Sequence, residues 1–133
     1  VSQLEELLAL NPEDQQAARE PLLACYLALG KRRHARKLLD AFSFDESAVF
    51  HWGRVLECVL AGDNAGARQA LAAARGQNPY VEPYLAFRKK PPKKWEQGVY
   101  TPGDREEAIH CLYVMGTAYA SHPEGVEWLR SAG

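Results

Sequence analysis

Cysteine is scarce in this chain and is not paired along the sequence. Cys25, Cys58 and Cys111 lie far apart, each in an apolar stretch. An odd number without a close pair argues against a disulfide framework and for a reducing compartment, so we expect a cytoplasmic protein. No apolar run approaches the ~18–20 residues of a membrane span. The chain begins without a signal-peptide pattern, and because Val1 is not a natural start, we expect a piece of a longer protein.

The short motifs of catalysis and metal binding are also missing. The sequence has no glycine-rich phosphate loop, no Gly-x-Ser-x-Gly elbow and no His-Glu-x-x-His helix. Zinc ligands cluster at spacings such as Cys-x-x-Cys, whereas the adjacent pair His110 and Cys111 would diverge around a helix. Cysteines among apolar neighbours are usually inert core residues. The sequence therefore predicts no enzymatic activity, no metal and no cofactor.

What the chain does have is the composition of an ordinary globular domain. Of its 133 residues, 47% are hydrophobic and 25% are charged, and the formal net charge is −1. This apolar content is enough for a core without a disulfide or metal staple. The length is that of one domain, so we expect residues 1–133 to form a single unit. The net charge favours neither nucleic acid nor an anionic membrane as a partner.

Apolar residues recur at helical spacing almost throughout, and no segment alternates with period two, so we predict an all-α fold. The expected helices cover residues 4–10, 14–29, 32–42, 47–61, 64–77, 81–88, 104–119 and 124–129. Pro21 lies inside the second of them, where its ring and missing N–H should kink or divide the helix. Residues 89–103 are rich in proline and lysine and are predicted to be an irregular insertion.

Part of the sequence repeats at the spacing of a helix pair. Ala35 and Leu39 are matched by Ala67 and Leu71, 32 residues later in each case. The first unit has the order of the tetratricopeptide signature, with a close-packed pair, a tyrosine, a turn glycine and a small alanine at Leu22-Leu23, Tyr26, Gly30 and Ala35. This order predicts a tetratricopeptide-like right-handed superhelix of antiparallel helix pairs. A bundle of unrelated helices is the alternative.

The second unit is aligned by placing Gly53 opposite Leu23. The interval from Gly53 to Ala67 is then two residues longer than that from Leu23 to Ala35. We therefore expect a longer turn between the helices of the second pair. Small residues are required where helix axes approach closely. This requirement explains why alanine or glycine occurs at Ala35, Gly53 and Ala67.

Several longer segments resemble a known family. These are Asn11–Gln16, Asn78–Leu85, Pro91-Pro92, Gly103–Ile109 and Glu124–Leu129. Together they are similar to the suppressor-of-tumorigenicity-seven family and its bacterial relatives. The resemblance implies a tetratricopeptide-like architecture and no well-defined activity. Alanine- and arginine-rich stretches such as Ala70–Arg75 indicate a bacterial source.

Basic residues are concentrated in two runs, 31–37 and 88–94, which hold 10 of the 16 lysines and arginines. Two solvated faces would explain this pattern. The sharper hypothesis is a basic lip that attracts an acidic peptide or nucleic acid. A sequence pI of about 6.5 argues against a dedicated nucleic-acid binder. The lip would consist of Arg32, Arg33, Arg36, Lys89, Lys90, Lys93 and Lys94.

The predicted function is a non-catalytic scaffold that holds a protein or peptide segment in a concave groove. The first helix of each stacked pair lines such a groove. On the repeat pattern, the groove residues are Glu20, Ala24, Leu27, Phe50, Arg54 and Glu57. Phe50 and Arg54 are the expected anchors, since aromatic residues and arginine are enriched in binding hot spots. The alternatives are ordinary core packing of Leu27 and Phe50, a nucleic-acid-associated module, and a structural spacer within a larger protein.

Overall fold

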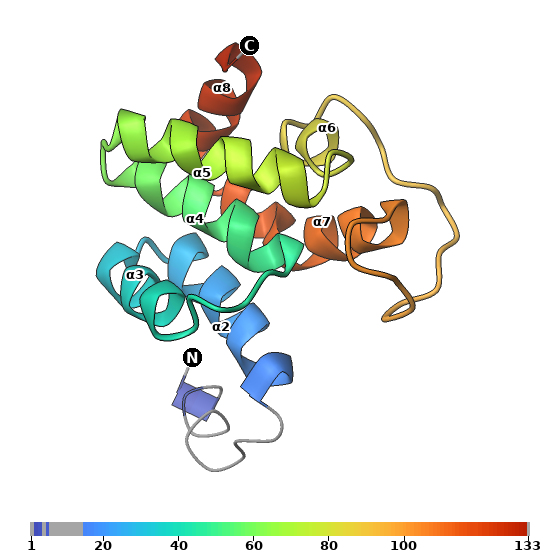
Figure 1. Cartoon of the computed structure of the whole chain (residues 1–133), viewed down its shortest axis with the longest axis horizontal. Helices are drawn as coiled ribbons and strands as arrows, with labels where there is room; N and C mark the ends of the chain where they lie inside the picture. Colours follow the sequence, from blue (N-terminus) through green and yellow to red (C-terminus); the bar gives the residue numbers. More distant parts are fainter. Residues whose placement is uncertain (1, 4, 6–14, 133) are drawn as a thin grey trace.

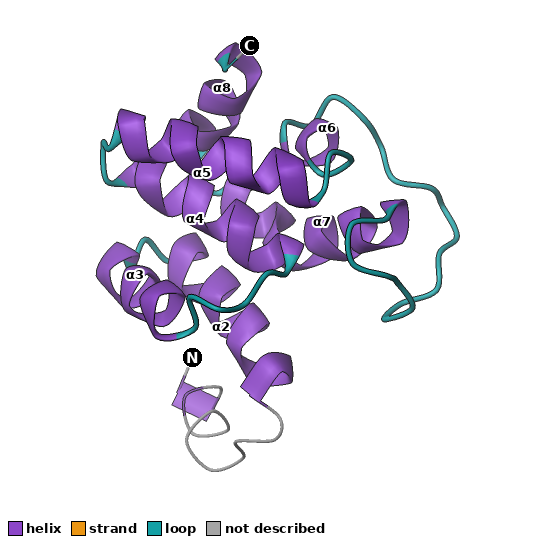
Figure 2. Cartoon of the chain, in the orientation of Figure 1, coloured by secondary structure: helices purple, strands orange, loops and turns teal. Residues whose placement is uncertain are grey.

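The structure, a computed structural model, describes residues 2, 3, 5 and 15–132 of the chain. Residues 15–132 form seven helices and no strand, which confirms the all-α prediction (Figure 2). The helices are α2 (Gln15–Ala28), α3 (Arg32–Ala41), α4 (Ala48–Leu60), α5 (Asn64–Gln77), α6 (Glu82–Leu85), α7 (Arg105–Ala120) and α8 (Pro123–Ser131). The helix expected over 4–10 falls almost entirely outside the described residues.

The first two predicted helix pairs are present. Helix α2 packs against α3, and α4 packs against α5 (Figure 1). The turns that join them, 29–31 and 61–63, have the same length, so the longer second turn expected from the sequence is wrong. Each turn places a glycine in the left-handed region, Gly30 with φ of 74° and Gly62 with φ of 75°. A left-handed residue after a helix is typically glycine, because a β carbon is unfavourable there.

Local side-chain bonds start α4, α5 and α7 close to the positions predicted from the sequence. Ser47 accepts a hydrogen bond from the Phe50 N–H, and Asp63 accepts one from the Gly66 N–H. Asp104 does the same for the Glu107 N–H at 2.7 Å. These caps satisfy N–H groups that have no partner inside the helix. Helix α2 runs without interruption through Pro21, so the proline does not divide it.

Helix α7 lies across the two helix pairs and completes the core. It packs against both α2 and α4, and α8 packs against α4 and α7 (Figure 1). Trp52, Met115 and Tyr119 are fully buried where these helices meet. The contact between α2 and α7 differs from an open stack, in which a repeat touches only its neighbours.

Residues 86–104 contain no helix or strand, which agrees with the irregular insertion predicted at 89–103. Two aromatic stacks hold this segment on α7. Trp95 stacks on Tyr113 and Tyr100 stacks on His110, both with ring centroids 4.8 Å apart. The segment therefore follows a defined path over the surface of the helices.

The small residues predicted at helix contacts are buried, and Gly53 allows a testable prediction. A β carbon at Gly53 would lie 2.7 Å from Leu23 Cδ2 and 3.5 Å from Met115 Cε, where α2, α4 and α7 converge. Gly53→Val should therefore lower the free energy of unfolding by about 1–3 kcal/mol, because the core becomes overpacked.

The matched control is Gly76→Ala in α5, where a β carbon would meet nothing within 4 Å. It should raise the free energy of unfolding by about 0.5–1 kcal/mol through helix propensity alone. Urea unfolding of both variants is the measurement. Equal stabilisation of the two would show that the three helices do not meet closely at Gly53.

Candidate functional site

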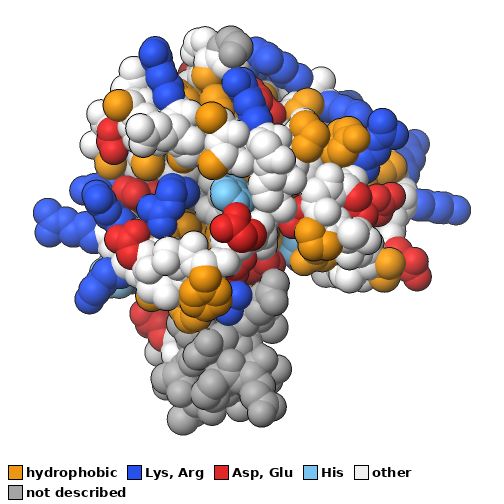
Figure 3. All heavy atoms as spheres, in the orientation of Figure 1, with side chains coloured by type: hydrophobic (Ala, Val, Ile, Leu, Met, Phe, Trp, Pro, Cys, Tyr) orange, Lys and Arg blue, Asp and Glu red, His pale blue; other side chains and the backbone are white. Residues whose placement is uncertain are grey.

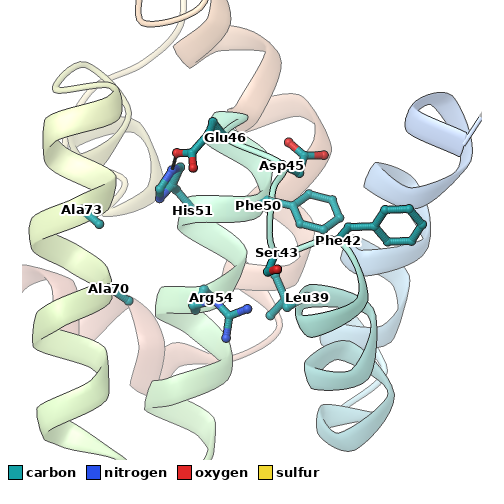
Figure 4. A pocket seen from close by; sticks show the side chains of 10 residues that line it. All are labelled: Leu39, Phe42, Ser43, Asp45, Glu46, Phe50, His51, Arg54, Ala70 and Ala73. Carbon is teal, nitrogen blue, oxygen red and sulfur yellow. Dashed lines mark hydrogen bonds and ion pairs between the residues drawn. The ribbon is translucent and has the colours of Figure 1, made fainter.

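A trough runs along α4 between α3 and α5. It consists of two hollows that share Arg54 and Ala70, with volumes of about 140 Å³ and about 350 Å³. Figure 4 shows the first hollow, with side chains from α3, α4 and α5 around it. The first hollow is lined by Leu39, Phe42, Ser43, Asp45, Glu46, Phe50, His51, Arg54, Ala70 and Ala73. We call the two hollows together the α4 trough.

The first hollow has an aromatic and aliphatic floor. The Phe50 ring is almost fully buried and meets the Phe42 ring edge to face, with centroids 6.5 Å apart. On the α5 side, Ala70 and Ala73 point toward the opening (Figure 4). Alanine methyl groups leave the space that a larger side chain would fill. A volume of about 140 Å³ is enough for one group of about the size of benzene.

Charged residues of both signs border the trough. The Arg54 guanidinium donates a hydrogen bond of 3.2 Å to Asp40, and both side chains are more than one-third exposed. His51 lies 2.9 Å from Glu46, as the dashed line in Figure 4 marks. Exposed pairs of this kind contribute little to stability, so their members are free to exchange partners. Arg54 is therefore a cation that a ligand can reach.

A more buried ion pair fixes one wall of the trough. Arg19 Nε donates to Asp45 Oδ2 at 2.7 Å, and its guanidinium lies 4.7 Å from the centre of the Phe42 ring. Asp45 also accepts from the Ser47 N–H at 2.8 Å. Arg19 thus ties α2 to the segment that precedes α4. Arg19 is not among the predicted site residues, because nothing in the order of residues along α2 indicates a bond to a residue 26 positions away.

The structure divides the six predicted groove residues between two different faces. Phe50, Arg54 and Glu57 line the α4 trough. Glu20 and Leu27 are buried against α7 and the residues after it. Glu20 Oε1 lies 3.0 Å from His110 Nε2, and the Leu27 carbonyl oxygen lies 2.6 Å from His122 Nε2. Ala24 is half-buried and packs against the core. The six residues therefore do not form one groove.

A shift of two residues in the repeat alignment explains the division. The turn glycines Gly30 and Gly62 are 32 residues apart, so Gly53 corresponds to Pro21 and not to Leu23. Two residues turn an α-helix by about 200°, which places the two predicted sets on nearly opposite faces. With the correct register, Glu20 corresponds to Trp52, whose carbonyl oxygen accepts a hydrogen bond from Tyr119 of α7 at 2.6 Å. Both positions face α7.

The two basic runs do not combine into one lip. Residues 31–37 lie on and before α3, whereas residues 88–94 follow α6 on the other side of the molecule (Figure 1). Figure 3 shows Lys and Arg side chains at the left and at the right of this face, with others along its upper edge. Of the predicted lip residues, Arg36 lines the α4 trough, and Arg32 Nη1 lies 3.6 Å from Glu57 Oε2. Arg33 is exposed on α3, and Lys89, Lys90, Lys93 and Lys94 are exposed in the distant segment.

Glu107, in the first turn of α7, forms a buried polar centre. Its carboxylate accepts backbone N–H bonds from Ala48 at 3.1 Å and from Gly103 at 2.7 Å. It also accepts bonds from the side-chain amides of Gln77 and Asn78, at 3.0 Å and 3.1 Å. These donors come from the start of α4, the end of α5 and the insertion. A buried carboxylate with this many donors joins segments and has no free position for chemistry.

Partial or full burial favours the neutral forms of Tyr100, Cys58 and Cys111. Burial raises the pKa of Tyr100, and the nearby charges of Glu20, Glu107 and Asp45 raise it further. Burial also raises the pKa of the thiols of Cys58 and Cys111. A raised pKa lowers the thiolate fraction at neutral pH and makes a cysteine a poor nucleophile.

Within the described ranges, no group of three or more His, Cys, Asp or Glu side chains is arranged to hold a metal ion. Of the helices in the same part of the chain, none is both long enough and apolar enough to cross a membrane. A scan against protein-family models, a search of curated proteins and a search of solved structures each return no match.

The contacts of Glu107 lead to a second prediction. Glu107→Gln keeps the side-chain shape but places an amide NH₂ among N–H donors, so one donor loses its acceptor. We expect the free energy of unfolding to fall by about 2–4 kcal/mol. Glu106→Gln is the matched control, because Glu106 is the exposed neighbour in the same first turn of α7. Its effect should stay within about 1 kcal/mol. Equal losses in the two variants, measured by urea unfolding, would contradict the role given to Glu107.

Proposed function

We propose that this chain is a non-catalytic scaffold that binds a peptide segment of a partner protein in the α4 trough. The observation that carries the proposal is an open hollow of about 140 Å³, floored by Phe50, directly beside the accessible guanidinium of Arg54. An apolar pocket next to a reachable cation is a site for one anchoring side chain and one charge. Peptide segments of partner proteins commonly dock in grooves between helices.

The chemistry of the trough describes the segment it would bind. One apolar side chain of the partner enters the hollow between Phe50 and Ala73. An acidic group nearby in the partner replaces Asp40 as the partner of Arg54. Arg36 adds a second cation in the second hollow, which Glu57 and Asp63 also line. The proposed ligand is therefore a segment with an apolar residue followed closely by aspartate or glutamate.

The proposal also assigns the two helix hairpins to tetratricopeptide-like units of a right-handed superhelix. The antiparallel pairs α2–α3 and α4–α5, the equal turns and the buried Ala35 and Ala67 support this assignment. The likeness of the sequence to the suppressor-of-tumorigenicity-seven family and its bacterial relatives points the same way. The free cysteines support a reducing, cytoplasmic location.

Nucleic acid is a less suitable ligand for this surface. Affinity for nucleic acid comes mainly from several cations that contact a continuous track of phosphates. The runs 31–37 and 88–94 lie in two separate regions of the molecule, at α3 and in the segment after α6 (Figure 1). We therefore assign the trough to a peptide.

Selection from a displayed random-peptide library, followed by affinity measurement on variants, tests the proposal. We expect selected peptides to share an apolar residue close to an acidic one. Arg54→Glu should weaken their binding by roughly tenfold or more, because the interacting charge is reversed. Ala73→Trp should weaken it similarly by filling the hollow. Both variants alter partly or fully exposed positions, so the fold should remain intact.

Arg68→Glu is the matched control, since Arg68 is exposed on α5 but does not line the trough. It makes the same change of charge and should leave the affinity within about twofold. Peptides that bind Arg54→Glu and Ala73→Trp as tightly as they bind the unchanged chain would refute the trough as the binding site. Preferred binding of labelled RNA or DNA, with affinity falling steeply with salt, would favour the nucleic-acid alternative.

A further inference from the structure

A second open surface lies along α7, beside the turn that follows α6. Two adjoining hollows of about 430 Å³ and about 390 Å³ share Phe87 and Ala120. The first extends over Leu112, Tyr113 and Gly116 of α7, and the second reaches Val126 of α8. We call this surface the α7 strip. It shares no lining residue with the α4 trough.

Phe87 is displayed on the strip in an unfavourable backbone conformation. Its φ of 54° is in the left-handed region, which a residue with a β carbon rarely adopts. Its side chain is nevertheless exposed, so burial of the ring does not offset the strain. Strained residues of this kind concentrate at binding and catalytic sites, where a surrounding framework holds them. The strain therefore calls for an explanation other than core packing.

Two arginines hold the turn around Phe87 against α8. Arg130 Nε donates a hydrogen bond of 2.9 Å to the Ala86 carbonyl oxygen. Arg88 Nη2 donates one of 2.7 Å to the Arg130 carbonyl oxygen. The Phe87 N–H itself donates to the Tyr84 carbonyl oxygen at 3.0 Å. These three bonds hold the backbone of the turn, from which the Phe87 side chain extends beside α7 and α8.

The exposed side of α7 is uncharged and has small residues at helical spacing. No charged residue occurs from Cys111 to Ser121. Tyr113, Gly116, Thr117 and Ala120 follow one another at helical spacing and line the same hollow. The small residues Gly116 and Ala120, four apart, would let a second helix axis approach closely. Tyr113 is exposed and is held from one side by its stack with Trp95.

The chain segment next to the strip carries mainly positive charge. Between Pro83 and Trp95 the chain has five basic residues and no acidic one. Lys90 directly precedes Pro91, which lines the strip. At the other end, Glu127 lies 3.7 Å from Arg130, so this acidic side chain already has a basic neighbour. An occupant of the strip would therefore meet an uncharged first hollow, the Glu127–Arg130 pair in the second hollow, and the basic segment 88–94 beside them.

We propose that the α7 strip docks an acidic amphipathic helix of a partner protein. The apolar face of that helix would lie on Gly116 and Ala120 and contact the rings of Phe87 and Tyr113. Its acidic side chains would face the basic residues of the segment 88–94. Apolar burial supplies the affinity, and the complementary charges select the orientation and the partner.

The test uses two fluorescently labelled model helices of about 18 residues, long enough to be partly helical alone. Both carry the same leucine stripe, and the remaining positions are mainly glutamate in one and lysine in the other. Fluorescence anisotropy with the full chain measures the affinities. The acidic helix should bind roughly tenfold or more tightly than the basic one, and added salt should reduce the difference.

Phe87→Gly is the decisive variant, because glycine favours a positive φ and the folded chain should be no less stable. It should weaken binding of the acidic helix by roughly tenfold or more, the effect expected for a hot-spot aromatic. Ala120→Glu should weaken it similarly by placing a like charge on the floor. Leu29→Gly, which removes an exposed apolar side chain outside the strip, is the control and should leave the affinity unchanged.

Three results would overturn the proposal. The first is equal affinity for the acidic and basic helices. The second is undiminished binding of the acidic helix by both Phe87→Gly and Ala120→Glu. The third is a concentration-dependent dimer of the unchanged chain that Ala120→Glu abolishes, which would assign the strip to a second copy. Analytical ultracentrifugation of the same samples detects such a dimer.

Discussion

The buried carboxylate of Glu107 is the interaction on which the arrangement of the described helices depends. Its donors belong to segments 4 to 59 residues away along the chain. One of them, the Ala48 N–H, is in the first turn of α4, where the helix dipole favours a negative charge. Glu107 therefore fixes the start of α7 against the start of α4 and the end of α5. From that point α7 continues along α2 and α4.

The position of α7 decides which surfaces are open to partners. The face of α2 that carries Glu20 and Leu27 is covered by α7 and the residues after it. The face of α4 between α3 and α5 stays open, because the alanines of α5 do not fill the space over Phe50. The outer side of α7 itself becomes the uncharged floor beside Phe87. The packing of α7 thus covers the α2 half of the predicted groove, and it leaves open the α4 half and the outer side of α7.

Local features were predictable from the sequence, and long-range ones were not. Helix ends depend on a few neighbouring residues, so the sequence around them is enough to predict them. The caps at Ser47 and Asp104 and the turn glycines are examples. The register between the repeats depends on where each helix ends, and the turn glycines Gly30 and Gly62 would have set it correctly. Glu20 and His110, which interact in the structure, are 90 residues apart in the sequence, and no local sequence pattern predicts this contact.

A double-mutant cycle between α2 and α7 tests the central claim, that α7 covers the face of α2, most directly. Glu20→Ala, His110→Ala and the double variant are unfolded in urea, and the three losses in free energy are compared. Because the two side chains are 3.0 Å apart, we expect the losses to depart from additivity by about 0.5–3 kcal/mol. Losses that are additive within about 0.3 kcal/mol would show that Glu20 and His110 do not interact. The claim that α7 covers this face of α2 would then be wrong.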